Sequence, residues 1–92
     1  MKKLIHLRNV GKATLKDLEA VGIRSVSELA LCEPTELFQR LEKVTGKRHD
    51  PCMWDVFAAI IHEAKTGEAT SWWEWTAERK ELQKKMEIHH ER

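Results

Sequence analysis

The chain has few of the residues that mark several large protein classes. It contains no Tyr, only two Cys and only two Pro among its 92 residues. Two cysteines are too few for a disulfide scaffold. The longest apolar run, residues 56–61, is six residues long and far too short to cross a bilayer. A disulfide-stapled secreted domain and a membrane-spanning chain are therefore excluded.

The beginning of the chain resembles a signal peptide only superficially. Two lysines precede an apolar stretch, but Arg8 and Asn9 interrupt it before it reaches the length of a signal-peptide core. Without an export signal we expect a cytoplasmic protein, whose thiols stay reduced. Cys32 and Cys52 are then interpreted as inert thiols that are buried or half-buried.

The net charge is small, but it is unevenly distributed. The 16 Lys and Arg nearly balance the 15 Asp and Glu, so the net charge is +1. A charge of this size excludes a protein that coats nucleic acid by bulk charge alone. Residues 1–24, however, carry six cations against two carboxylates, a local net charge of +4 that leaves −3 for the rest.

Apolar spacing and capping residues predict short helices along the whole chain. No run alternates apolar and polar residues, so no strand is predicted. The expected helices run from residue 12 to about 20, from 26 to near 32, from 34 to about 45, from 51 to about 65 and from 72 to about 88. The fourth is the most apolar and is expected at the centre, and residues 88–92 at the end of the last are expected to fray. We therefore expect one all-α domain over residues 1–92.

A glycine turn precedes the first of these helices. Its pattern is Leu7-x-x-Val10-Gly11-x-x-Thr14-x-x-x-Leu18, which resembles a helix-hairpin-helix motif. Asn9 stands where the motif usually has its first glycine, and Asn is the residue that next best tolerates a left-handed backbone. The resemblance implies a SAM-like bundle of about five helices, with a core over residues 4–66 and a Trp-bearing helix over residues 70–88.

The hairpin predicts a contact with the phosphate backbone of DNA. Such a turn leaves N–H groups free at the start of the next helix, where they and the helix dipole suit a phosphate oxygen. This kind of contact does not read sequence. The expected contact residues are Arg8, Asn9, Val10, Gly11, Lys12 and Lys16. A purely structural turn, as in SAM-like interaction modules, is the alternative.

Three tryptophans at the start of the last expected helix suggest a second function. Trp72 and Trp75 share a helix face and are expected to pack on the central helix, whereas Trp73 points elsewhere. Trp73 and Arg79 are therefore candidates for contact with a protein partner, a second copy or an unpaired base. A cluster that only plugs the core is the other interpretation. If Trp73 contacts a protein, the chain is an adaptor or self-associating module, including a homodimer.

No residue pattern indicates catalysis, a metal or a cofactor. His49, Asp50 and Cys52 lie close together, but a closed metal site needs about four ligands, and no Cys-x-x-Cys or His-x-x-x-His pair is present. A nucleophilic cysteine would need a base and an oxyanion hole, and neither is indicated. Asp50 is interpreted as a helix cap, and we expect a non-enzymatic protein.

Two further pieces extend the resemblance beyond the hairpin. They are Thr45-Gly46 with His49-Asp50-Pro51-Cys52, and Trp72-Trp73-x-Trp75-Thr76. Together with the hairpin they resemble a small bacterial family known by the names "pathogenicity locus" and "mitomycin resistance", over roughly residues 4–80. Residues 7–31 also look like the C-terminal domain of TfoX-type competence regulators. Because these family names record genomic context, the resemblance implies a fold more directly than a reaction.

Overall fold

The computed structural model describes residues 3–89, and every regular element in that range is helical. The elements are the 3-10 helix η1 (Leu4–His6), the α-helices α1 (Lys12–Ala20), α2 (Val26–Ala30), α3 (Pro34–Thr45) and α4 (Cys52–Thr66), the 3-10 helix η2 (Trp72–Trp75), and α5 (Thr76–Lys84). The expected all-α class with about five helices is therefore confirmed. None of these helices combines the length and the apolar character that crossing a bilayer requires.

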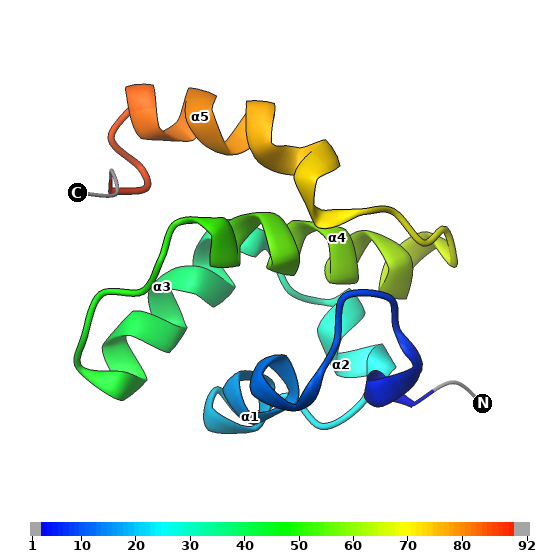
Figure 1. The fold of residues 1–92 in the computed structure, drawn as a ribbon. Coiled ribbons are helices and arrows are strands. Elements are labelled where there is room, and N and C mark those ends of the chain that lie inside the picture. Colours follow the sequence, from blue (N-terminus) through cyan, green and yellow to red (C-terminus); the bar gives the residue numbers. More distant parts are fainter. Residues whose placement is uncertain (1–2, 90–92) are drawn as a thin grey trace.

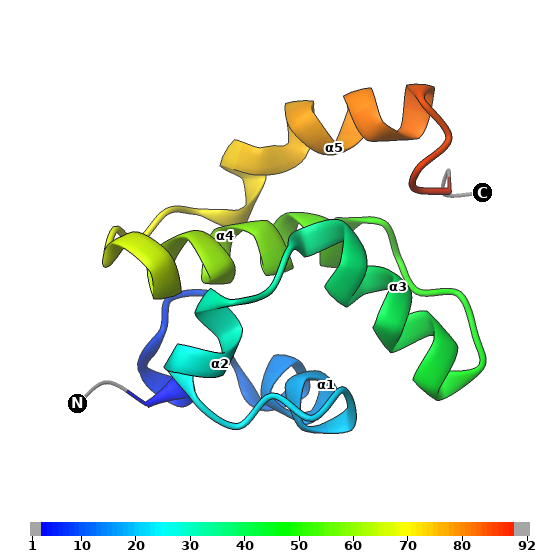
Figure 2. The ribbon, with the colours of Figure 1, turned by 180° about the vertical axis from the view of Figure 1, so that it is seen from behind.

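Helix α4 lies at the centre of the fold, as its apolar composition predicted. It packs against α2 and α3 on one side and against η2 and α5 on the other. Figures 1 and 2 show α5 on one side of α4 and the first three α-helices on the opposite side. The largest side chains sealed inside include Trp54, Phe57 and Ile60 of α4, and Phe38 of α3. Burial of these apolar surfaces is the main force that holds the helices together.

Local capping signals account for where the helices begin and end. The Ser25 hydroxyl accepts a hydrogen bond from the Glu28 N–H over 3.1 Å at the start of α2. The Asp50 carboxylate accepts one from the Cys52 N–H over 2.9 Å at the start of α4. Gly67, with φ of 81°, ends α4 in the left-handed conformation. The caps predicted at Ser25 and Asp50 are confirmed.

The C-terminal helix is shorter than the expected range of residues 72–88. The C-terminal helical segment begins with the tighter 3-10 helix η2, where the Ser71 N–H donates to the Glu74 carboxylate over 2.7 Å. α5 ends at Lys84, and Met86, with φ of 62°, then turns the chain back. The expected continuation of the helix to residue 88 is therefore wrong.

The segment after α5 folds back onto α3. Ile88 is buried in the core, and the ring of His89 lies 5.6 Å from the ring of Phe38. We expected residues 88–92 to fray, which is wrong for Ile88 and His89 because their apolar surface is covered here. The remainder of that prediction, residues 90–92, lies outside the described residues.

A buried ion pair fastens α5 to α4. Asp55 is 0% exposed and Arg79 8% exposed, with Nε of Arg79 3.1 Å from Oδ1 of Asp55 and Nη2 3.4 Å from Oδ2. The Thr76 hydroxyl donates to the same carboxylate over 2.7 Å. Burial alone would lower the pKa of the Arg79 guanidinium, but the hydrogen bond and negative charge of Asp55 outweigh it and raise that pKa. The Arg79 guanidinium therefore stays charged.

Removing one partner of this pair is expected to cost far more than breaking a surface pair. Arg79→Ala leaves the Asp55 carboxylate buried without a countercharge and should lower the free energy of unfolding by about 3–5 kcal/mol. Lys84→Ala, which breaks the exposed pair with Glu81 on the same helix, should cost less than about 1 kcal/mol. Urea unfolding followed by Trp fluorescence measures both. Equal losses would contradict this assignment.

Candidate nucleic-acid interface

Residues 7–11 form a turn that is anchored to the core by its apolar side chains. The side chains of Leu7 and Val10 are buried, and the Val10 N–H donates to the Leu7 carbonyl over 3.2 Å. Asn9 has φ of 73°, the left-handed conformation for which it was expected to substitute for glycine. The turn therefore presents its backbone outward while its apolar side chains point into the protein.

The turn is also tied to the segment that precedes η2. Nη2 of Arg8 donates to the Ser71 hydroxyl over 2.7 Å, and Nδ2 of Asn9 donates to the Thr70 carbonyl over 2.8 Å. The Arg8 N–H donates to the carboxylate of Glu63 over 2.9 Å. Two of the six expected DNA-contacting residues thus hold the turn in place through their side chains, and Val10 faces the core.

The first turn of α1 is open to solvent. Gly11 is the N-cap residue and supplies no side-chain cap, and Gly11, Lys12 and Ala13 are all exposed. Within residues 3–89, the N–H groups of Lys12, Ala13 and Thr14 have no acceptor. A Cβ added at Gly11, where φ is −109°, would meet no atom within 4 Å. The fold itself therefore does not require glycine at this position.

The charge around this helix start is positive. Lys12 and Lys16 are both exposed, and the first turn of α1 has no acidic residue. α3 begins differently, because Glu33 and Glu36 surround its start. The starts of α2 and α4 are occupied by the side-chain caps described above. α5 has Glu78 in its first turn. The start of α1 therefore differs from those of the other described α-helices, because it has free donors, nearby cations and no carboxylate in its first turn.

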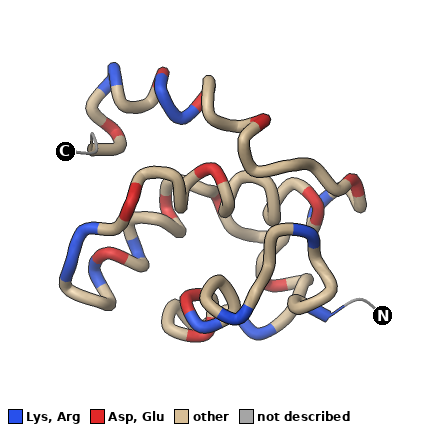
Figure 3. The backbone as a smooth tube through the Cα atoms, in the orientation of Figure 1, with Lys and Arg blue, Asp and Glu red and all other residues tan. Residues whose placement is uncertain are grey.

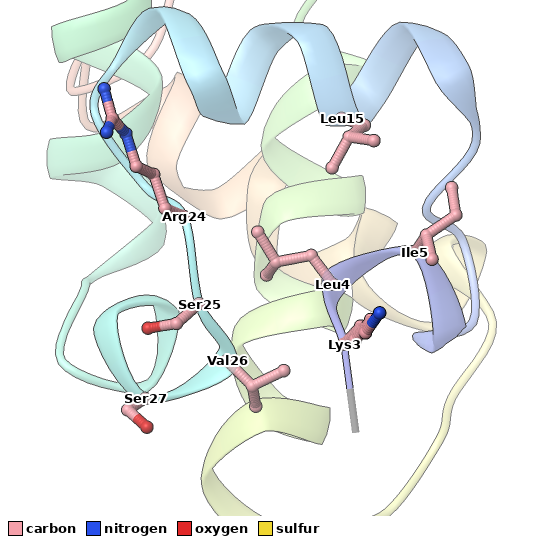
Figure 4. A pocket seen from close by; sticks show the side chains of 8 residues that line it. All are labelled: Lys3, Leu4, Ile5, Leu15, Arg24, Ser25, Val26 and Ser27. Carbon is pink, nitrogen blue, oxygen red and sulfur yellow. The ribbon is translucent and has the colours of Figure 1, made fainter. Parts of the chain in front are cut away.

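An apolar groove opens along the flank of α1 (Figure 4). Its volume is about 500 Å³, and it lies between η1, α1 and the beginning of α2. The lining residues are Lys3, Leu4, Ile5, Leu15, Arg24, Ser25, Val26 and Ser27. Leucine, isoleucine and valine side chains form most of the wall, which does not suit a phosphate group. The groove adds the cations Lys3 and Arg24 to the charge near the hairpin.

The tryptophans divide between the core and the surface. Trp75 packs on the core, its ring lies 5.3 Å from the ring of His62, and its Nε1 donates to the Thr70 hydroxyl over 2.9 Å. Trp73 is 60% exposed, and its ring meets that of Trp72 edge-on at 5.8 Å. The exposure of Trp73 agrees with expectation, whereas Trp72 packs on Trp73 more than on the core.

Arg79 is not part of a surface site beside Trp73. Its guanidinium is directed into the protein, where Asp55 binds it. The expectation that Arg79 contacts a partner is therefore corrected, because its charge is already paired inside the fold. Sequence reasoning had overlooked Asp55, although a lone carboxylate in the apolar stretch of residues 53–61 was the available signal for a buried cation.

The cluster of His49, Asp50 and Cys52 has local structural roles. Nε2 of His49 lies 2.7 Å from the Thr45 hydroxyl, and Asp50 caps α4. Burial, followed by the hydrogen bond with Asp50, raises the pKa of the Cys52 thiol, which is the opposite of an activated nucleophile. Within residues 3–89, no group of three or more His, Cys, Asp or Glu is arranged to hold a metal ion.

Two comparisons relate the chain to known proteins. Residues 1–81 match the model of a family named Cdd1, whose description is "pathogenicity locus". The chain is 35% identical over 79 residues to "Mitomycin resistance protein McrB" of Streptomyces lavendulae, a match that covers 86% of this chain and 75% of that protein. No solved structure matches the chain.

The left-handed conformation of Asn9 predicts an ordered pair of substitutions. Asn9→Gly keeps the backbone conformation and loses the hydrogen bond to Thr70, whereas Asn9→Ala loses both. We expect the alanine variant to be less stable than the glycine variant by about 1–2 kcal/mol. Urea unfolding of the two variants tests this. Equal stabilities would show that the backbone conformation of Asn9 contributes nothing.

Proposed function

The chain belongs to the Cdd1, or pathogenicity locus, family, and from that premise we propose that it is a small, cytoplasmic, non-enzymatic protein that binds DNA. The contact is with the phosphate backbone and is independent of sequence. It is made by the turn of residues 7–11 and by the first turn of α1. The family name itself specifies no ligand, so the proposal depends on the geometry of this turn.

The open start of α1 is the observation that carries the proposal. A phosphate oxygen can accept hydrogen bonds from the free N–H groups of residues 12–14, and the helix dipole favours its negative charge. Gly11 has no side chain to hold the phosphate away, and Lys12 and Lys16 flank the same position. Figure 3 shows Lys and Arg on α1 and at the turn before it, together with the acidic residues that α1 also carries.

The remaining hairpin residues support this contact. Arg8 is exposed, and only its Nη2 has a side-chain partner among the described residues, so Nε and Nη1 remain available to a phosphate. Asn9 and Val10 supply the shape of the turn. A site with so few cations predicts weak binding. The affinity should also fall as salt rises, and each phosphate contact should add about −0.9 to the slope of log affinity against log salt concentration.

Charge reversal on α1 tests the proposal. In fluorescence anisotropy at about 50 mM salt with a duplex of about 20 base pairs, Lys12→Glu/Lys16→Glu should bind at least about tenfold more weakly than the wild type. Circular dichroism should show the same helical content, because both side chains are exposed. Equal affinities of the two proteins, or no binding by either, would overturn the proposal.

A glycine pair separates the backbone contact from charge alone. Gly11→Ala should leave the stability nearly unchanged, since the added Cβ meets nothing, yet it should weaken DNA binding by placing a methyl group against the phosphate. Gly22→Ala is the matched control. Gly22 has φ of 83°, so this variant should lose about 1 kcal/mol of stability and keep its affinity when folded.

The exposed Trp73 favours a second candidate function. A 60% exposed Trp that is braced edge-on by Trp72 is typical of an anchor residue in a protein interface. On this proposal the chain is an adaptor or associates with a second copy through Trp73, with no dependence on DNA.

The size of the protein in solution tests the second candidate. If Trp73 anchors self-association, light scattering should show a dimer for the wild type and a monomer for Trp73→Ala. The free energy of unfolding of Trp73→Ala should change little, because most of the Trp73 side chain is exposed to solvent in the fold. A wild-type monomer at every concentration, unaffected by DNA, would contradict self-association.

A further inference from the structure

A second cationic surface lies at the turn between α3 and α4. Residues 43–49 contain Lys43, Lys47 and Arg48 and no carboxylate. All three side chains are exposed, and none has a partner within residues 3–89. Figure 3 shows a short blue stretch in this turn at the left edge of the molecule, with red segments on α3 and just before α4. We call Lys43, Lys47 and Arg48 the turn cations.

The backbone of this turn is held in one shape by hydrogen bonds on both sides of the cations. The Thr45 hydroxyl donates to the Leu41 carbonyl over 2.8 Å and lies 2.7 Å from Nε2 of His49. Gly46, with φ of 69°, makes the reversal, and Asp50 closes the turn by capping α4. A turn fixed in this way loses little conformational entropy when its cations bind a ligand.

Two carboxylates, Glu42 and Asp50, flank the turn cations, and each accepts a backbone N–H, Glu42 from His49 and Asp50 from Cys52. Oε2 of Glu42 accepts a hydrogen bond from the His49 N–H over 2.8 Å and lies 2.6 Å from Nε2 of His89. Glu42 therefore links the turn to the C-terminal segment. Lys47 and Arg48 are left at the tip of a fixed turn with their charges unpaired in the described chain.

The turn belongs to the same side of the fold as the hairpin helix. In Figures 1 and 2, α1 and the C-terminal end of α3 lie on one side of α4 and α5 lies on the other. α1 contacts α3, and Nη1 of Arg40 on α3 donates to the Val21 carbonyl at the end of α1 over 3.4 Å. The positions of the turn and the start of α1 are therefore fixed relative to each other.

We propose that the turn cations are a second phosphate contact for the same DNA duplex. This inference rests on the proposed function of the hairpin. The longest principal extent of the molecule is 38 Å, which corresponds to about 11 base pairs at 3.4 Å per base pair. A duplex of about 20 base pairs can thus touch both, and a second contact compensates for the few donors of the first.

Charge reversal at the tip of the turn tests the inference. Lys47→Glu/Arg48→Glu should weaken binding to a duplex of about 20 base pairs at least about tenfold and reduce the slope of log affinity against log salt by about 2. Lys84→Glu/Lys85→Glu is the matched control, because it changes the net charge equally at two adjacent exposed lysines at the end of α5. The control should lose less than about threefold, since it lies on the other side of α4.

The results distinguish this inference from the proposed function. If the turn variant binds like the control while Lys12→Glu/Lys16→Glu loses binding, the turn contact is overturned and the hairpin contact stands. If only the turn variant loses binding, the turn binds DNA and the hairpin proposal is overturned. No DNA binding by the wild type would overturn both. Circular dichroism of each variant confirms that it is folded.

Discussion

The placement of the turn of residues 7–11 depends on the contacts that the buried carboxylate of Asp55 makes with α5. By binding Arg79 and Thr76, this carboxylate holds the beginning of α5 against α4. This fixes η2 and the residues just before it, where Thr70 and Ser71 receive the side chains of Asn9 and Arg8. Taking this pair out of water costs free energy that only a well-aligned geometry offsets, so the pair favours one position of α5 against α4.

This arrangement changes how the tryptophan cluster is interpreted. Trp75 packs on the core and its Nε1 donates to the hydroxyl of Thr70. It therefore supports the segment of residues 70–71, which contacts Arg8 and Asn9. Trp73 lies at the surface and does not contribute to this support. The two interpretations of the cluster, a core plug and an interaction surface, therefore apply to different members of it. Hydrogen bonds between residues 8–9 and residues 70–71 join the expected core over residues 4–66 to the expected Trp-bearing segment over residues 70–88.

Features that depend on neighbouring residues could be predicted from the sequence. The caps at Ser25 and Asp50, the left-handed Asn9 and the central position of α4 follow from residue type and local spacing. The contact of Arg8 with Ser71 could not be predicted, because 63 positions separate them and nothing in either local pattern indicates the other. The end of α5 was misjudged for the same reason, since burial of Ile88 by the core overrides helical propensity there.

The contacts between residues 8–9 and residues 70–71 also have a consequence for how the protein folds. Closing a loop of about 60 residues carries an entropic cost that only contacts from the rest of the fold can offset, so such contacts form after local helices. The hydrogen bonds within α1 are local, but a nine-residue helix is marginal alone, and the orientation of its start needs a nearly finished chain. We therefore expect the turn of residues 7–11 in a nascent chain on the ribosome to become oriented only after residues 70–71 have been synthesised.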